Sequence, residues 1–291
     1  MNFSIVIPTF NNFNYLKLSI DSIRKNSFFK NQIIVHINGN DIKTENYLNE
    51  LEIEYTKSDI NIGLCSGVNM ASKKCSNNYF VYSHDDMYFL PKWDFFLYEE
   101  IKRFNTELFY LSSTQISHIP DTGGHEIPNH IYFDAGDNID NFDEKKLLDN
   151  YEKLKFYDLQ GSHWAPHVIH RDIWNRIGGF SEEFNPGFGS DPDLNMKLWK
   201  IGVRIFKGVN QSRIYHFGSL TTRKNNSVKQ NNSRLTFLLK WKITMDFFIK
   251  FYLKRGRIFN GPLSEPSFSL SYLSNYLFSK LKYYFNLWKK N

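Results

Sequence analysis

The sequence predicts an α/β protein with a mostly parallel sheet flanked by helices, followed by a helical extension at the C-terminus. Three observations predict it. Short apolar runs alternate with amphipathic segments in the first part of the chain, polar clusters follow the apolar runs, and the composition changes after residue 233. Alternating strands and helices favour a parallel sheet with helices on both faces. The 291 residues suffice for one large domain with an appendage.

The first part of the chain has the clearest pattern of elements. FSIVIP at 3–8 is an apolar run closed by proline, as in a buried parallel strand. A helix is expected over 14–25, where Leu16, Ile20 and Ile23 share one face. A second helix is expected over 63–74, and three further strands are expected over 32–37, 53–57 and 79–83. Because ligands bind at the carboxyl ends of such strands, the polar clusters that follow them should meet at one rim.

The rest of the chain is less regular. Residues 118–150 are rich in Gly, Pro, Asp and Asn and are expected to form a loop. Helices are expected at 170–177, before two glycines, and at 191–201, where a proline and two acidic residues occupy the first turn. Two Lys-containing amphipathic stretches, 235–255 and 268–290, make up the predicted extension.

Charge supports a division into a domain of residues 1–233 and an extension of residues 234–291. The domain holds 25 Lys and Arg against 28 Asp and Glu, whereas the extension holds 11 against 2. A basic segment favours nucleic acid or an anionic membrane surface. We expect the membrane surface and no nucleic acid.

The remaining bulk features indicate a cytoplasmic protein. Cys65 and Cys75 lack the spacing of a zinc site or a disulfide framework, so we expect reduced thiols. The N-terminal apolar run lacks the basic flank of a signal peptide. No uncharged apolar run reaches the roughly 18 residues of a membrane-spanning helix.

The acidic pair Asp85-Asp86 follows the expected strand 79–83. Adjacent carboxylates repel unless a cation neutralises them, and Mg²⁺ is commonly shared between carboxylates and a substrate phosphate. The alternative is a solvated turn, in which aspartate is frequent. His216, after a further expected strand, is either a metal ligand or a hydrogen-bonded structural residue.

Two glycine-containing segments also carry candidate chemistry. Residues 61–69 open a helix after a strand, where exposed N–H groups suit a phosphate and glycines also suit a tight turn. Residues 187–193 present Asp191 and Asp193 at a helix start. A carboxylate there can act as a base toward an acceptor hydroxyl, or it can cap the helix.

Together these segments resemble the family-2 glycosyltransferases with the GT-A fold. The resemblance runs from residue 3 to about residue 219 and rests on the order and spacing of the motifs. The matching segments are VIPTFNN at 6–12, NIGLCSGVN at 61–69, YSHDD at 82–86 with Pro91, and IGGF at 177–180 followed by SDPDL at 190–194.

The resemblance implies a metal-dependent, inverting transfer of a sugar from a nucleotide-sugar donor to an acceptor hydroxyl, in surface polysaccharide or glycoconjugate synthesis. Asp191 is then the general base and Asp193 supports the acceptor. Asp86 is the direct ligand of Mn²⁺ or Mg²⁺, and His216 contacts the metal or the diphosphate. The donor residues implied are Pro8, Thr9, Phe10, Asn38, Asp59, Asn61, Gly63, Asn69, Asp85 and Asp86.

Several positions depart from the family pattern. His84 and Ser190 stand where acidic residues are usual, and Val68 stands where arginine is common. Asn38 ends the second strand in place of aspartate. These departures leave the donor sugar and the base of the nucleotide open.

Two further regions are expected to bind partners. Trp164 either stacks on an acceptor sugar beside His163 or packs in the core. In the extension, Leu277 and Trp288 belong to a Leu-rich helical stripe flanked by lysines that include Lys290, which is typical of an interfacial membrane helix. The alternative is packing on the domain or in a homodimer. The acceptor expected is a saccharide or a lipid-linked saccharide.

Two other functions remain open from the sequence. A sugar nucleotidyltransferase would carry a Gly-rich loop with Arg and Lys after the first strand, which PTFNNFNYLK at 8–17 lacks. A non-catalytic sugar-binding or scaffolding domain fits the departures at His84 and Ser190.

Overall fold

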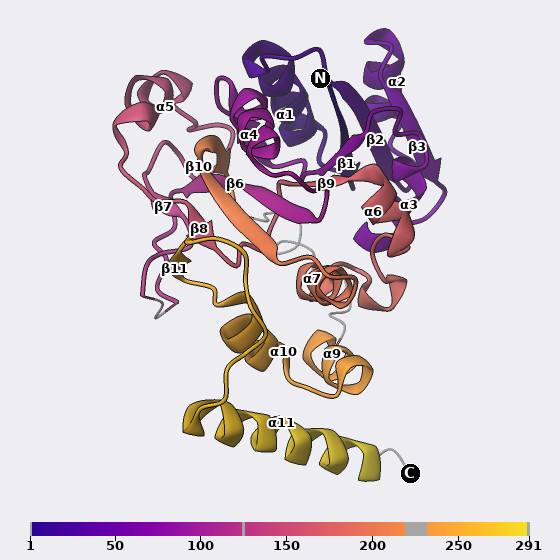
Figure 1. Ribbon diagram of the computed structural model, residues 1–291. Helices are drawn as coiled ribbons and strands as arrows, with labels where there is room; N and C mark the ends of the chain where they lie inside the picture. The colour runs from indigo at the N-terminus through magenta and orange to yellow at the C-terminus, as the bar shows by residue number, and fades with distance from the viewer. Residues whose placement is uncertain (1, 124–125, 219–231, 290–291) are drawn as a thin grey trace.

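The structure is a computed structural model that describes residues 2–123, 126–218 and 232–289. Its centre is one large sheet (Figure 1). The strands are β1 (Phe3–Thr9), β2 (Gln32–Asn38), β3 (Glu54–Ser58), β4 (Tyr79–Tyr82), β5 (Met87–Phe89), β6 (Phe109–Ser117), β7 (Ile131–Tyr132), β8 (Leu159–Gln160), β9 (His167–His170), β10 (Ile205–His216) and β11 (Arg257–Ile258).

Helices surround this sheet and form the C-terminal part of the chain (Figure 1). They are α1 (Phe13–Asn26), α2 (Ile42–Glu50), α3 (Leu64–Ser72), α4 (Trp93–Arg103), α5 (Glu144–Asn150), α6 (Arg171–Arg176), α7 (Ser190–Lys200), α9 (Ser233–Trp241), α10 (Met245–Phe247), a π-helix (Phe248–Leu253) and α11 (Leu270–Trp288).

The strand order is β11-β8-β10-β6-β9-β4-β1-β2-β3, with β5 paired to β10 and β7 to β6. β1 pairs in parallel with β2 and β4, and β2 pairs in parallel with β3. β6 and β10 are also parallel, while β9 runs antiparallel between β4 and β6. The predicted α/β fold with mostly parallel central strands is therefore confirmed.

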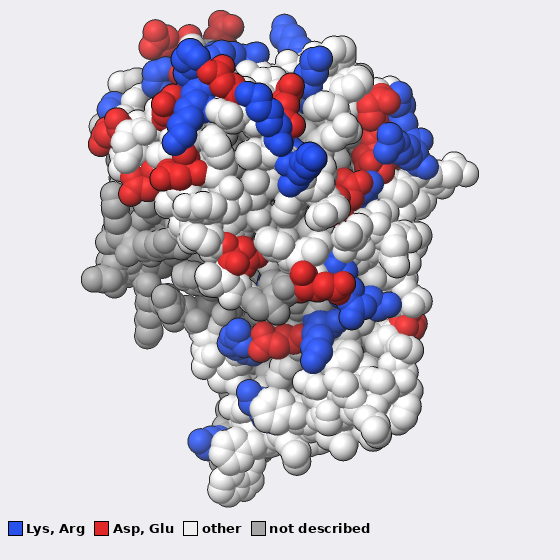
Figure 2. All heavy atoms as spheres, turned by 90° about the vertical axis from the view of Figure 1, so that its left-hand side faces the viewer, with Lys and Arg blue, Asp and Glu red and all other residues white. Residues whose placement is uncertain are grey.

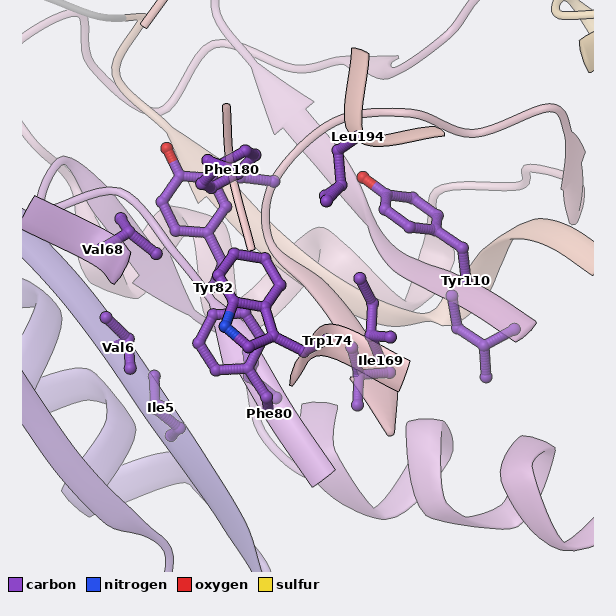
Figure 3. Packing of buried hydrophobic residues seen from close by; sticks show 14 of the residues in the cluster. Ile5, Val6, Val68, Phe80, Tyr82, Tyr110, Ile169, Trp174, Phe180 and Leu194 are labelled. Atoms are coloured by element: carbon purple, nitrogen blue, oxygen red, sulfur yellow. The ribbon is translucent and has the colours of Figure 1, made fainter. Parts of the chain in front are cut away.

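Aromatic side chains join helix α6 to the central strands (Figure 3). The ring of Trp174 lies 4.2 Å from that of Phe80, and Phe180 contacts Tyr82 with ring centroids 5.1 Å apart. The indole N–H of Trp174 also donates to Ser72 Oγ at 3.1 Å, so α6 is fixed to α3 as well. This packing holds the turn after α6 against the carboxyl end of β4.

Parts of the predicted element pattern were wrong. The expected loop 118–150 contains β7 and α5, and the side chain of Asp143 caps α5 by accepting from Lys146 N. Strand β6 was not anticipated because its centre is polar. Those polar side chains are buried against β10, where Ser113 bonds to Ser212 at 2.7 Å and Thr114 donates to the Val209 carbonyl. Helices α2 and α4 were also missed.

The extension after residue 233 is largely integrated into the domain. β11 pairs with β8, and Phe237, Phe248 and Leu253 belong to the main hydrophobic core. Only α11 stands apart, at the end of the molecule opposite the N-terminus (Figure 1), where Tyr272 and Tyr276 contact Phe247. None of the described helices is long and apolar enough to cross a membrane.

Candidate active site

The carboxyl ends of β1 and β4 meet at one rim of the sheet, as the sequence predicted. β1 ends with the buried Pro8 and Thr9. The hydroxyl of Thr9 donates to Asp85 Oδ2 at 2.7 Å, which joins the two strand ends directly. Phe10 follows beside Gly39, where a Cβ would lie 3.5 Å from the Phe10 ring.

Asn38 and Asn61 shape the loop that follows β2 and β3. Asn38 is 4% exposed, and its Oδ1 accepts from the backbone N–H of Ile62 at 3.0 Å. Asn61 Oδ1 accepts from Gly63 N at 2.9 Å. Asp59 is exposed at the same rim. Their contacts support a loop-forming role for the two asparagines and leave Asp59 accessible.

The N-terminus of α3 is occupied by a side chain from a distant segment. Asn185 Oδ1 accepts from Cys65 N at 3.0 Å, and a Cβ on Gly63 would lie only 2.4 Å from that oxygen. Gly63 is thus required for close approach. The backbone N–H of Cys65, at the helix start where a phosphate was expected to bind, therefore already has a partner within the protein.

Asn69 serves a similar structural purpose. Its Nδ2 donates to the Phe180 carbonyl at 2.8 Å, and its Oδ1 accepts from Phe180 N at 2.9 Å. These two bonds attach α3 to the Gly-Gly-Phe turn after α6. The amide expected to contact the donor is therefore engaged with the backbone.

Asp85 and Asp86 are both buried, at 8% and 3% exposure. Burial, and then the neighbouring charge of Asp86, raise the pKa of Asp85 from its ordinary 3.8 to about 7. The hydroxyl of Thr9 acts in the opposite direction, because it donates to the ionised form. Full ionisation of both neighbouring carboxyl groups at this buried point of the rim is therefore unfavourable unless a cation is present.

Asp86 lies between two histidines. His216 Nε2, at the end of β10, is 3.3 Å from Asp86 Oδ1, and His84 Nδ1 is 3.9 Å from the same oxygen. One ligand atom from each residue lies within 4.8 Å of the others. Burial lowers the pKa of His84 to about 4, so this imidazole is neutral near pH 7. Imidazole nitrogens and a carboxylate form a donor set that suits a divalent metal. His84, treated in the sequence only as a departure, completes this cluster.

Asp191 lies in the first turn of α7, after Gly189 with φ of 81°. Its Oδ1 is buried and has no hydrogen-bond partner among the described residues. Burial raises the pKa of Asp191 from 3.8 to about 7. An unpartnered carboxylate with this pKa can accept a proton near neutral pH.

Tyr82, at the end of β4, is influenced by the charges of both Asp85 and Asp191. Burial raises the pKa of Tyr82 well above its ordinary value, and the charges of Asp191 and Asp85 raise it further. Its ring lies 5.4 Å from that of His84. The charges of Asp85 and Asp191 thus both act on Tyr82, although these two residues are more than 100 positions apart in sequence.

A cavity of about 930 Å³ opens beside Asp191 and is lined by His163 and Trp164. Trp164 is partly exposed, and His163 is 7% exposed with its ring 5.4 Å from the Trp164 ring. The structure therefore brings these two predicted acceptor residues together with the predicted base. Much of the remaining lining comes from the C-terminal extension, for which packing on the domain was the alternative to membrane contact.

Asp193 does not have the acceptor-binding position that was predicted for it. It is fully buried, and its two oxygens are engaged by Lys240 at 3.0 Å, Trp241 at 2.8 Å and Ser181 at 2.6 Å. An acceptor has no access to this carboxylate. Its contacts identify Asp193 as the anchor of the extension on α7, a role that no sequence signal indicated.

The fold and this rim define a glycosyltransferase. The family model described as Glycosyl transferase family 2 matches residues 4–165, which is more than half of the chain. The chain therefore belongs to glycosyl transferase family 2, and the predicted resemblance is confirmed. Membership in this family removes the nucleotidyltransferase alternative. The matched segment ends before Asp191 and His216.

Solved structures share the fold at low sequence identity. TarS 1-349 of S. aureus has a TM-score of 0.52 and 15% identity, over 74% of this chain and 60% of that one. Its complex with UDP-GlcNAc has a TM-score of 0.52 and 15% identity, over 75% and 61%. Mannosyltransferase PcManGT from Pyrobaculum calidifontis, in complex with GDP-Man and Mn²⁺, has a TM-score of 0.51 and 11% identity, over 74% and 56%.

The chain thus spans about 60% of the length of the first of these structures. No curated protein matches the sequence.

Proposed function

We propose that this chain catalyses an inverting, divalent-metal-dependent transfer of a sugar from a nucleotide-sugar donor to the hydroxyl of a saccharide acceptor. Two observations carry the proposal: Asp191, whose buried Oδ1 has no partner among the described residues, lines the cavity, and ligand atoms of His84, Asp86 and His216 lie within 4.8 Å of one another. A single displacement needs a base on the acceptor side and a sink for negative charge on the leaving-group side. The chain has a candidate for each.

Asp191 is the general base of this proposal. Its Oδ1 has no partner in the described part of the chain, and its carboxylate lines the cavity. Trp164 offers a ring face on which an acceptor sugar can stack, next to His163. An acceptor hydroxyl held between Trp164 and Asp191 would lose its proton to Asp191 as it attacks the donor sugar.

His84, Asp86 and His216 would hold the metal. When bound, the cation would neutralise charge on the nucleoside diphosphate leaving group. The fit rests on three converging donor atoms and on the buried His216 Nε2, which makes no hydrogen bond of good geometry within the described chain. Two imidazoles with one carboxylate favour a transition metal such as Mn²⁺ over Mg²⁺, which prefers oxygen ligands.

The donor would lie along the ends of β1, β2 and β3. Thr9 and Phe10 are at the rim, Asp59 is accessible for contact with the base, and Asp85 would face the ribose or diphosphate. Asn38, Asn61, Gly63 and Asn69 would act indirectly, since their contacts shape the surrounding loops.

We further propose that the enzyme works in surface polysaccharide or glycoconjugate synthesis, at the cytoplasmic face of a membrane. The support comes from α11, which contains no acidic residue and exposes an apolar stripe. That stripe comprises Leu270, Leu273, Leu277, Phe278, Leu281, Tyr284, Phe285 and Trp288. Figure 2 presents the lower end of the molecule as largely free of charged side chains.

Lysines flank this apolar stripe. Lys280, Lys282 and Lys289 lie over the rings of Tyr276, Phe278 and Phe285, respectively, at 5.1, 4.5 and 4.6 Å. An anionic lipid surface suits such a helix, which would lie in the interface without crossing it. Lys290 lies outside the described residues.

Thermal unfolding with nucleotide sugars and metal tests the enzymatic proposal. UDP-sugars and GDP-sugars should raise the unfolding temperature in Mn²⁺ more than in Mg²⁺, because a ligand that binds only the folded state stabilises it. Asp86→Ala should abolish the metal-dependent part, whereas Asp172→Ala, with a side chain 77% exposed, should retain it. Unchanged metal-dependent stabilisation in Asp86→Ala would contradict the assignment.

A further inference from the structure

The cavity beside Asp191 has a cationic wall that comes from the C-terminal extension. The cationic side chains that line it are Arg234, Lys250, Lys254, Arg255 and Arg257. Among the described lining residues the carboxylates are Glu126, Asp246 and Asp191. The described lining of this cavity is therefore richer in positive than in negative charge.

Two of these carboxylates are already engaged by cations of the wall. Arg234 pairs with Asp246 at 2.5 Å, and Arg257 lies 3.7 Å from Glu126. Both pairs are largely exposed, so each neutralises charge locally at the cavity edge.

Lys250 and Lys254 form no ion pair with any described residue. Within the described part of the chain, no carboxylate lies within ion-pairing distance of either ammonium group. Both line the same cavity as Asp191. An anion that enters this cavity would be attracted by both positive charges.

Arg255 is held firmly in this wall. Its Nη1 donates to His163 Nε2 at 3.2 Å, and His163 Nδ1 donates in turn to the Gly161 carbonyl at 3.1 Å. A Cβ on Gly161 would lie 2.1 Å from the Leu253 carbonyl oxygen, so glycine permits the extension to approach here. The backbone and His163 together fix the guanidinium beside Trp164.

We propose that the acceptor saccharide carries an oxyanion, either a phosphate or a carboxylate, which binds Lys250, Lys254 and Arg255 while the reacting hydroxyl lies at Asp191. This inference rests on the proposed function, in which the cavity receives the acceptor. The extension thereby selects the acceptor in addition to any contact with a membrane. Charge-assisted hydrogen bonds from Lys and Arg to phosphate or carboxylate supply the selectivity.

Affinity electrophoresis of the full chain in native gels tests this proposal. The gels contain neutral dextran, phosphorylated dextran or carboxymethyl dextran, so the backbone is constant and only the anion changes. At least one anionic dextran should retard the protein, and the neutral polymer should not. The arm that retards more strongly identifies phosphate or carboxylate as the preferred group. Equal retardation by neutral and anionic dextran, or retardation by neither anionic polymer, overturns the proposal.

Matched charge variants locate the binding. Lys250→Gln with Lys254→Gln should weaken binding about tenfold or more, because a hydrogen bond to a charged group contributes about 1.5 kcal/mol or more and 1.4 kcal/mol corresponds to a factor of ten. Lys73→Gln with Lys74→Gln removes two exposed lysines at the end of α3 and should change binding less than twofold. An equal loss in both double variants means non-specific attraction and overturns the proposal.

The lysines of α11 provide a second comparison. Lys280→Gln with Lys282→Gln should weaken dextran binding less than the cavity variant does, and a larger loss in this variant places the anion on α11 instead. Stabilisation by UDP-sugars and GDP-sugars with Mn²⁺ should persist when Lys250 and Lys254 are replaced. Its loss means that these lysines serve the donor, which also overturns the inference. A native chain that none of these donors stabilises contradicts the proposed function itself.

Discussion

Lys240 Nζ lies 3.0 Å from Asp193 Oδ1, and this ion pair joins the C-terminal extension to the helix that carries the candidate base. Asp193 is completely buried, and the indole N–H of Trp241 donates to the same oxygen at 2.8 Å. Lys240 also donates to Ser181 at 2.8 Å. Because Asp191 is two residues before Asp193 on α7, the extension helps to fix the position of the base.

Lys240→Met should therefore destabilise the fold. The substitution keeps an apolar stem but leaves the Asp193 carboxylate buried without its cation. Removing one partner of a buried ion pair lowers the free energy of unfolding by about 3 to 5 kcal/mol. Because Lys240 is 26% exposed, we expect a loss near the low end of this range, about 3 kcal/mol. Urea unfolding measures the loss. Lys145→Met breaks an exposed pair with Asp149 and should cost under about 1 kcal/mol. Equal costs for the two variants would rule out the anchoring role.

Asn69→Ala should lower stability without weakening donor binding. The variant loses two hydrogen bonds to the backbone of Phe180, each worth about 1 kcal/mol, so unfolding should become easier by about 2 kcal/mol. Asn49→Ala, at an exposed position of α2, should change stability little. Urea unfolding and donor titration measure the two quantities. A large loss of donor affinity at normal stability would restore the direct donor contact expected from the sequence.

The raised pKa of Asp191 predicts a pH-dependent stability term. Between about pH 4 and pH 7 the folded state keeps a proton that the unfolded chain has lost. The stability from this protonation is complete below the unfolded pKa and disappears as pH rises through about 7. Asp191→Asn cannot ionise, so its stability relative to the native chain should rise from pH 5 to pH 8. Urea unfolding at both pH values measures the change. A difference that stays constant with pH would mean that Asp191 has an ordinary pKa.

Helix α11 should bind vesicles that contain anionic lipid. Each nearby lysine contributes about 1 kcal/mol, an attraction that salt screens, whereas burial of apolar side chains is not screened. Co-sedimentation should therefore weaken at high salt without vanishing. Leu277→Asp with Leu281→Asp should abolish it, and Ile42→Asp, at an exposed apolar position of α2, should not. If the double variant still binds vesicles, α11 is not the membrane contact and packing on the domain is favoured. If the variant dissociates a dimer, self-association is favoured instead.

The sequence predicted β1, β2 and β4 well because these strands are mostly apolar and each is followed by polar residues. It missed β6 because Ser113 and Thr114 are buried by bonding to β10, and burial of that kind leaves no apolar periodicity. The strand ends did meet, as the bond between Thr9 and Asp85 demonstrates. Parallel register brings strand ends together whichever side chains they carry.

The candidate site was predictable where single residues carry the chemistry. Asp191 was a candidate because it follows a glycine-rich loop and matches a family motif, but the roles of Asn69 and Asn185 depend on partners more than 100 residues away. The contribution of Arg255 to the cavity was equally hidden. A basic amphipathic segment has the same sequence pattern whether it contacts lipid or lines a pocket. The close approach of Leu253 to Gly161 shows that this part of the extension packs on the domain.

The most direct test of the whole account is turnover by Asp191→Asn. Release of nucleoside diphosphate from the best-stabilising donor, in Mn²⁺, should fall by roughly a hundredfold or more, within the range that general-base catalysis contributes. Donor affinity should persist, because Asp191 lies on the acceptor side. Asp172→Asn, an exposed carboxylate, should leave turnover unchanged. Near-normal turnover in Asp191→Asn would contradict the account, since no base would then be needed at this position.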